Sequence, residues 1–171
     1  DALTLEVNRT LNLDKTHNMN HKGMYHSPVK PTWVTPHPLK PKVYVAGNGS
    51  NEIIEIDTEI WEITNRIDTG KGPYNIDISS NGKFLVATLK GDAKTMVWEL
   101  DKKNPSVVSN NSSVTHGVVI SPDSKYAFVT VEGVGGDPGL VDVIDLKKAK
   151  VVSSISIGKQ AGGIAFWKIE E

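Results

Sequence analysis

The chain has 171 residues, of which 38% are hydrophobic and 6% aromatic, and its 19 basic and 20 acidic side chains leave a formal net charge of −1. It contains no cysteine, which excludes disulfides, thiolate metal ligands and cysteine nucleophiles. The sequence holds no long run of Lys and Arg, and no apolar run approaches the ~18 residues of a membrane span. We therefore expect one sizeable core, no nucleic-acid partner and no membrane span.

A long repeat organises the sequence. The segments EIIEID, MVWELD and VDVID end at Asp57, Asp101 and Asp145, which are 44 residues apart each time. Residues 72–88 (GPYNIDISSNGKFLVAT) align with residues 114–130 (VTHGVVISPDSKYAFVT), and residues 31–47 align with both. Self-similarity of this period is typical of solenoids, repeat arrays and propellers. Because a residue repeated in every unit usually caps a turn, we expect the three aspartates to be structural.

Each unit predicts four short antiparallel strands. Apolar residues alternate with period two or form short β-branched stretches, and turn signals such as Asn81-Gly82 and Pro122-Asp123 separate them. A lone four-stranded sheet leaves its apolar faces in water, so consecutive sheets should stack around an axis. The predicted fold class is all-β, a β-propeller of four-stranded antiparallel blades that is incomplete in this chain.

In chain order the repeat divides the sequence into six parts. Residues 1–13 match only the outer strand of a preceding blade, and residues 14–30 form a His/Met-rich insertion between blades. Residues 31–70, 71–114 and 115–158 each make a blade, and residues 159–171 match only the inner strand of a closing blade. Since the chain starts at Asp1, within an element, we expect a processed or truncated product.

Three blades and two single strands do not close a ring. We expect the C-terminal half of a seven-bladed propeller, whose partner is the missing half, supplied by the same polypeptide or by a second chain. Self-association of two partial rings ranks second, and an isolated four-bladed ring ranks third.

The last unit, SPDSKYAFVTVEG followed by GLVDVIDLKKAKVVSSISIG, resembles the repeat of YVTN-type β-propellers, which are related to surface-layer and YncE-like proteins. That repeat has a Ser-Pro-Asp-Gly turn, a Tyr-Val-Thr-Asn strand, Val-Ile-Asp and a closing Ile-x-x-Gly. The resemblance covers residues 31–171, with departures at Ser124 and in the segments LVATLKG and YVAGNGS. It implies a propeller fold and a periplasmic, cell-surface or secreted location, and it implies little about activity.

The insertion is the most unusual stretch of the sequence. It concentrates soft and nitrogen ligands, namely His17, Met19, His21, Met24 and His26. Imidazole nitrogen and thioether sulfur together suit copper, so one hypothesis is a copper site, or a site for another transition metal. The alternative is a polar cap over the channel in which the imidazoles are solvated.

Register places the insertion at the mouth of the central channel. The connection from an outer strand to the next inner strand crosses one end of a propeller, and Thr32, Tyr74, His116 and Gly162 each stand just ahead of an inner strand. We therefore expect His116 to share a face with the insertion and to be a further metal-ligand candidate. Thr32, Tyr74 and His116 are candidate ligand-binding residues, although backbone hydrogen bonding for His116 and packing for Tyr74 are the simpler interpretations.

Three functions remain open. The first is a non-catalytic extracytoplasmic binding or scaffold propeller that presents its channel-mouth loops to a protein or small-molecule ligand. The second is a copper-binding propeller that uses the His/Met insertion with His116. The third is a metal-assisted hydrolase or lactonase acting at the channel. The first is favoured because no recognisable catalytic set appears in the sequence.

Overall fold

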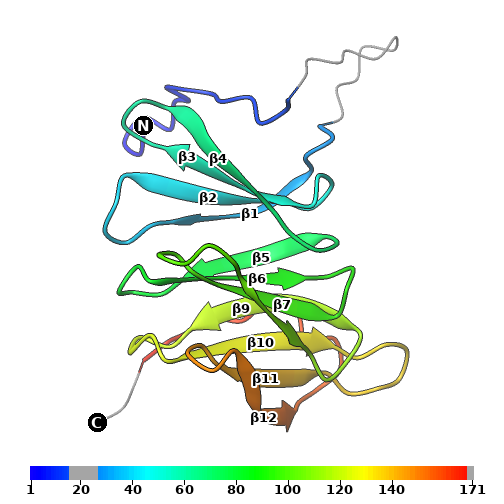
Figure 1. Cartoon of the computed structure of the whole chain (residues 1–171). Coiled ribbons are helices and arrows are strands. Elements are labelled where there is room, and N and C mark those ends of the chain that lie inside the picture. Colours follow the sequence, from blue (N-terminus) through cyan, green and yellow to red (C-terminus); the bar gives the residue numbers. More distant parts are fainter. Residues whose placement is uncertain (16–26, 169–171) are drawn as a thin grey trace.

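A computed structural model describes residues 1–15 and 27–168 of the chain, and this part is all-β (Figure 1). Twelve strands form three four-stranded antiparallel sheets that stack one on another, and the stack does not close into a ring. The predicted fold class is thereby confirmed. None of the described residues forms a helix that could cross a membrane.

Each sheet keeps the order of the sequence, from an inner to an outer strand. Blade 1 consists of β1 (Pro31–Pro36), β2 (Lys42–Gly47), β3 (Glu52–Asp57) and β4 (Glu62–Asp68). Blade 2 consists of β5 (Pro73–Ile78), β6 (Phe84–Leu89), β7 (Lys94–Glu99) and β8 (Ser106–Ser109). Blade 3 consists of β9 (Val114–Ile120), β10 (Tyr126–Glu132), β11 (Leu140–Asp145) and β12 (Lys150–Ser156).

The blades are held together by their apolar faces. We call the face that looks toward the preceding blade upstream, and the opposite face downstream. Because side chains alternate along a strand, each strand contributes to both faces. The downstream face of blade 1 meets the upstream face of blade 2 in one core, formed by Tyr44, Ala46, Ile53, Ile76, Ile78, Leu85, Ala87, Leu89, Met96 and Trp98.

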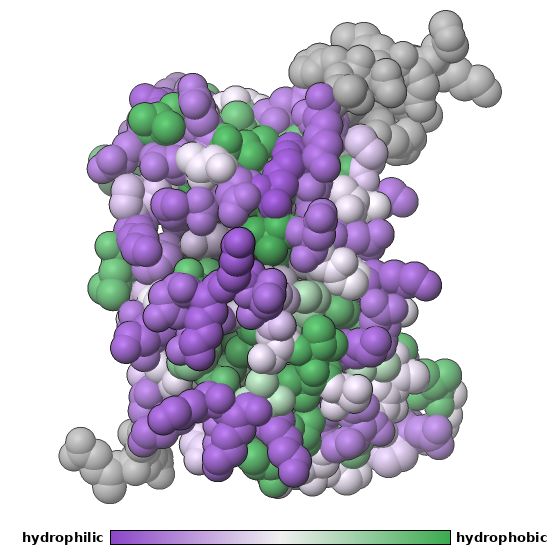
Figure 2. All heavy atoms as spheres, in the orientation of Figure 1, coloured by the Kyte–Doolittle hydropathy of each residue, from purple (hydrophilic) through white to green (hydrophobic). Residues whose placement is uncertain are grey.

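A second core joins blades 2 and 3. Val86, Val97 and Val108 of blade 2 pack against aliphatic residues of blade 3, including Val129 and Ile144, which are fully buried. Burying one such side chain is worth roughly 1.5–3 kcal/mol, so the two interfaces supply the main driving force for the fold. Figure 2 shows that hydrophilic residues cover most of the face in view, while hydrophobic residues gather in a strip in its lower half.

The turn between the inner and second strands is built on a side-chain acceptor. In blade 2, Ser79 Oγ accepts the N–H groups of Lys83 and Phe84 at 3.2 and 2.9 Å. Ser121 holds the same position in blade 3, and its Oγ also accepts the N–H groups four and five residues on. In blade 1 the position belongs to His37, whose Nδ1 accepts the Leu39 N–H at 3.0 Å. His37 therefore occupies the turn position that Ser79 and Ser121 hold in the other two blades.

The recurring aspartates are not all equivalent. Asp57 and Asp145 end the third strands of their blades and accept backbone N–H groups of the following turn, so their predicted capping role is confirmed. The third strand of blade 2 ends instead at Glu99, which pairs with Phe84 as Asp57 pairs with Lys42. The prediction was wrong for Asp101, which lies two residues later. The third strands end at residues 57, 99 and 145, which are 42 and 46 residues apart. The equal spacing of 44 is therefore a coincidence: Asp101 lies two residues into its turn, and the link between the second and third strands is longer in blade 3 (residues 133–139) than in blade 2 (residues 90–93).

The two terminal segments, 1–13 and 159–171, were predicted to be single strands of neighbouring blades. Residues 1–13 and the described residues 159–168 form no strand. A strand requires a hydrogen-bonded neighbour in its sheet, and the strands that would flank these segments are not among the described residues. Both segments nevertheless lie against the stack, because Leu11 and Leu13 pack on the upstream face of blade 1 and Ala161 is buried beside blade 3.

His37 should make the protein sensitive to acid. Its side chain is buried, and burial, reinforced by the positive charge of Lys40, lowers its pKa below 6.5. The unfolded chain therefore binds a proton at a higher pH than the folded chain, so the free energy of unfolding falls as the pH drops below about 6.5. His37→Asn keeps an acceptor for the Leu39 N–H but does not titrate, and its unfolding free energy should fall less between pH 7 and pH 5. Urea denaturation at the two pH values measures the difference, and equal losses in both proteins would contradict it.

Candidate functional site at the crossover end

One end of the stack gathers the candidate residues. The links from each outer strand to the next inner strand, residues 69–72 and 110–113, cross this end, so we call it the crossover end. Thr32, Tyr74 and His116 lie there, among the first three residues of β1, β5 and β9. Since these three inner strands belong to successive blades, the three residues follow one another from blade to blade.

Each inner strand is irregular at this point. The ladder between β1 and β2 shifts around Thr32, and the ladder between β5 and β6 shifts between Pro73 and Ile76, which includes Tyr74. The ladder between β9 and β10 shifts in the same region, beside His116. A β-bulge bends its strand and redirects a side chain, and here it does so in every blade at the same position.

Threonine hydroxyls connect the bulges of adjacent blades. Thr88 Oγ1 accepts the Asn75 N–H at 3.1 Å within blade 2 and donates to the His116 carbonyl of blade 3 at 2.7 Å. Thr130 repeats this arrangement by bonding to Gly117 and to the carbonyl of Gly162. The His116 and Gly162 carbonyls are therefore equivalent, as the sequence alignment expected.

The step from blade 1 to blade 2 uses another residue for the same purpose. The second strand of blade 1 carries Ala46 where Thr88 stands in blade 2, so it offers no hydroxyl there. The bulge residue Thr32 supplies one instead, and its Oγ1 donates to the Tyr74 carbonyl at 2.7 Å. At this end, a threonine hydroxyl thus links each blade to the inner strand or segment that follows it.

Tyr74 and His116 are in direct contact. Their ring centroids are 4.5 Å apart with planes inclined by 56°, a tilted aromatic pair. The Lys90 ammonium lies 4.6 Å from the Tyr74 ring centroid and 3.8 Å from a carboxylate oxygen of Glu132. The four side chains therefore form one cluster that combines two rings, a cation and an anion, all partly open to solvent.

The cluster keeps His116 neutral. Burial lowers its pKa below 6.5, and the nearby Lys90 ammonium lowers it further. Glu132 and a hydrogen bond to the Gly162 backbone act in the opposite direction without reversing the shift. A neutral imidazole can accept a hydrogen bond or ligate a metal, which a protonated one cannot do.

Of the six predicted metal ligands, His116 alone is among the described residues. His17, Met19, His21, Met24 and His26 lie outside the described residues. The flanks of their segment are described, and both lie at the crossover end: Lys15 is 3.4 Å from the buried carboxylate of Glu52, and the Val29 carbonyl accepts the Gly49 N–H. Within residues 1–15 and 27–168, no three His, Asp or Glu side chains are grouped as a metal would need.

Sequence reasoning missed several residues of this site. Thr88 and Thr130 are the final residues of the aligned segments FLVAT and AFVT, a repeated position whose role the sequence alone does not indicate. Asn48, Lys90 and Glu132 follow or end the second strand of each blade at a constant 42-residue spacing, which is a second periodic signal. Only contact distances show that Lys90 and Glu132 join the rings of Tyr74 and His116.

The inner strands carry one half-buried carboxylate below this site. Asp77 of β5 accepts the Ile120 N–H of β9 at 2.8 Å and also the N–H of Ile78. Burial raises the pKa of Asp77, while these two hydrogen bonds lower it. The carboxylate serves to tie one inner strand to the next across the blade boundary.

The comparisons with known proteins agree on the fold. No protein-family model and no curated protein matches the sequence. Among solved structures, Kuenenia stuttgartiensis hydrazine synthase matches 85% of this chain and 41% of its own, with a TM-score of 0.72 and 18% identity. U3-55K and the WD40 repeats of RRP9 each match 77% of this chain and 40% of their own, with TM-scores of 0.64 and 16% identity. The chain thus spans about two fifths of these structures, which are propellers, and identities this low show the fold alone.

The electrostatics of the cluster can be tested by titration. Lys90→Met removes the cation that opposes protonation of His116, so the pKa of His116 should rise, while Glu132→Gln should lower it. NMR titration of the imidazole resonances measures both shifts, and His37, in the turn at the far end of β1, serves as the internal reference. An unchanged His116 pKa in Lys90→Met would show that the ammonium does not act on the ring.

Proposed function

We propose that this chain is part of a non-catalytic propeller that binds a ligand or protein partner at its crossover end. The propeller-like stack is a scaffold that supports a general binding role. The observation that carries the proposal is the Tyr74–His116 ring pair with Lys90 and Glu132, because it places aromatic, cationic and anionic groups together at the mouth of the stack. Aromatic rings combined with a few charged groups are typical of surfaces that recognise ligands.

A non-catalytic role fits the described residues better than a hydrolase. A metal-assisted hydrolase or lactonase would need carboxylates near the axis that are free to hold a metal and a water molecule. The carboxylate of Asp77 is engaged with two backbone N–H groups, and Glu132 faces Lys90. The resemblance to YVTN-type propellers supports a location in the periplasm, at the cell surface or in the medium.

Binding at this cluster can be tested with a fragment library of small aromatic acids, amines and sugars screened by protein-observed NMR. The proposal expects shift changes around Tyr74 and His116, and Tyr74→Ala should weaken binding by about tenfold, the equivalent of one lost aromatic contact. Tyr126→Ala is the matched control, because Tyr126 is a partly exposed tyrosine at the opposite end of its blade. Fragments that bind equally well to Tyr74→Ala would contradict the proposal.

A copper site remains the second candidate function. It is supported by the shared position of His116 and the flanks of the His/Met segment at the crossover end, and by the neutral state of His116. A propeller that uses His17, Met19, His21, Met24, His26 and His116 would hold Cu(I) through sulfur and nitrogen, or Cu(II) mainly through nitrogen.

Chelator competition with Cu(I) and Cu(II) tests the copper site. The triple variant His17→Ala/His21→Ala/His26→Ala should lose at least about tenfold in affinity, the lower end of the cost of losing a metal-site partner. His37→Asn removes a histidine at the opposite end of the stack and should leave the affinity unchanged. Equal affinities of wild type and triple variant would eliminate the hypothesis.

A further inference from the structure

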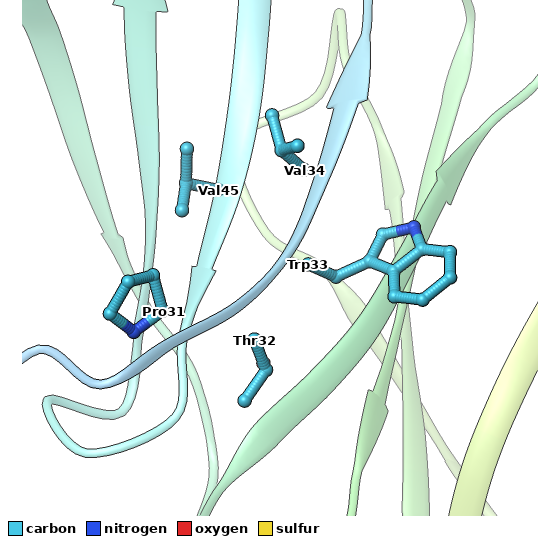
Figure 3. Close-up of a pocket in the computed structure, with 5 residues that line it drawn as sticks. All are labelled: Pro31, Thr32, Trp33, Val34 and Val45. Carbon is cyan, nitrogen blue, oxygen red and sulfur yellow. The ribbon is translucent and has the colours of Figure 1, made fainter. Parts of the chain in front are cut away.

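The upstream face of blade 1 is exposed where the same face of the other blades is buried. Val34 on β1 is 58% exposed, whereas its counterparts Ile76 on β5 and Val118 on β9 are 0% and 4% exposed. The register supports this equivalence, since Val34 pairs with Val45 as Ile76 pairs with Ala87. Val34 and Val45 border an open pocket of about 510 Å³ (Figure 3). This surface therefore has the composition of a blade interface without its partner.

The start of the chain has the geometry of a turn inside a blade. Asp1 Oδ1 accepts the N–H groups two and three residues on at 2.8 and 2.9 Å, as Asp57 Oδ1 does at 2.9 and 3.2 Å. Four residues after each aspartate the backbone is left-handed, with φ of 59° at Leu5 and 62° at Trp61. A positive φ is rare outside glycine, so two coincident signatures identify the same structure. Residues 1–5 reproduce the turn between the third and outer strands of blade 1.

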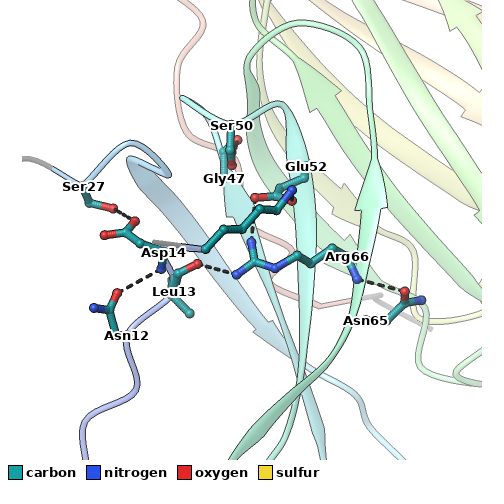
Figure 4. A network of polar contacts seen from close by, with 10 residues as sticks. Asn12, Leu13, Asp14, Ser27, Gly47, Ser50, Glu52, Asn65 and Arg66 are labelled. Atoms are coloured by element: carbon teal, nitrogen blue, oxygen red, sulfur yellow. Dashed lines mark hydrogen bonds and ion pairs between the residues drawn. The ribbon is translucent and has the colours of Figure 1, made fainter. Parts of the chain in front are cut away.

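The residues that follow this turn lie where an outer strand would lie. Ile67 stands ten residues after Asp57 and packs against the core between blades 1 and 2. Leu11 stands ten residues after Asp1 and packs against the upstream face of blade 1. The Arg66 guanidinium, which is paired with Glu52 at 2.8 Å, also donates to the Leu13 carbonyl (Figure 4).

The N-terminal segment covers only part of this face. Leu11 and Leu13 join the cluster formed by Val29, Val45, Ile54 and Ile56, with Val43 and Ile63 at its margin. The part next to the inner strand, around Val34, stays open as the pocket. An outer strand covers the outer part of the next blade, and the inner three strands of its sheet cover the rest. The uncovered area is thus the area that those three strands would occupy.

We propose that residues 1–13 are the last turn and outer strand of a further blade, and that three antiparallel strands from polypeptide outside this sequence complete it. The third of these strands ends at Asp1, as β3 ends at Asp57. The completed blade covers Val34 and Val45 with a face of mainly apolar residues, because Tyr44, Ala46 and Ile53 cover the same place on blade 2. The covering surface is therefore apolar, and it is joined to this chain at Asp1.

An extended chain tests the proposal. A copy of residues 30–57 is placed directly before Ala2, so that the copied Asp57 replaces Asp1 and three strands precede the native turn. The matched variants are Val34→Asp and Val107→Asp in the native portion, since both valines lie on strands and are 58% and 54% exposed. In the unmodified chain the two variants should lower the thermal midpoint equally and slightly. In the extended chain, Val34→Asp should lower it by about 10 °C more than Val107→Asp, because it alone buries a charge.

The same variants distinguish the other occupants of this face. Equal effects of the two substitutions in the extended chain, or an extended chain less stable than the unmodified one, would overturn the proposal. Sedimentation of the unmodified chain supplies a measurement that does not depend on the extension. A dimer that Val34→Asp dissociates and Val107→Asp leaves intact would show that a second copy occupies the face, which also overturns the proposal. None of these outcomes bears on ligand binding at Tyr74 and His116.

Discussion

The structure depends on the burial of two apolar faces for every four-stranded sheet. A sheet with a single apolar face can rest on one neighbour, but a sheet with two must stand between neighbours. Ile76 and Val86 lie on opposite faces of blade 2 and are both fully buried, so neither contact can be given up. At roughly 25 cal/mol per Å² of apolar surface, these two contacts dominate the stability of the described stack. The same requirement makes the uncovered upstream face of blade 1 the natural point of further association.

Stacking also produces the candidate site. Blades that meet face to face place their inner strands side by side, and an inner strand has no strand on its channel side to take its N–H and C=O groups. The chain meets this requirement with side chains: Asp77 accepts the Ile120 N–H, and Thr88 donates to the His116 carbonyl. The bulges at the crossover end then turn Tyr74 and His116 away from the regular ladder. The contact between Tyr74 and His116 therefore follows from the way in which the backbone N–H and C=O groups of the inner strands find their hydrogen-bond partners.

The sequence was sufficient for the fold because its signals are local and repeated. Turn residues such as Ser79 and Ser121 hydrogen-bond within five residues, so the pattern of one blade can be read from another. Equivalent positions could not be found from spacing alone, because the third strands end 42 and then 46 residues apart, and Asp101, in the turn after Glu99, happens to lie 44 residues from both Asp57 and Asp145. The site was only partly predictable, since Lys90 and Glu132 belong to different blades and their contact depends on the rotation between sheets. No local pattern encodes that rotation.

The candidate cluster depends on the contact between two blades. Tyr74 and Lys90 come from blade 2, and His116 and Glu132 from blade 3, so the cluster exists only where two blades meet. Thr32 occupies the equivalent bulge of blade 1, and its side chain is exposed, because the surface beside it is the uncovered upstream face. Thr32 already joins blade 1 to blade 2 through its hydrogen bond to the Tyr74 carbonyl, and a blade docked on the upstream face would lie on its other side. In the proposed complete stack, the contacts that bury the upstream face of blade 1 would therefore also surround Thr32 at the crossover end.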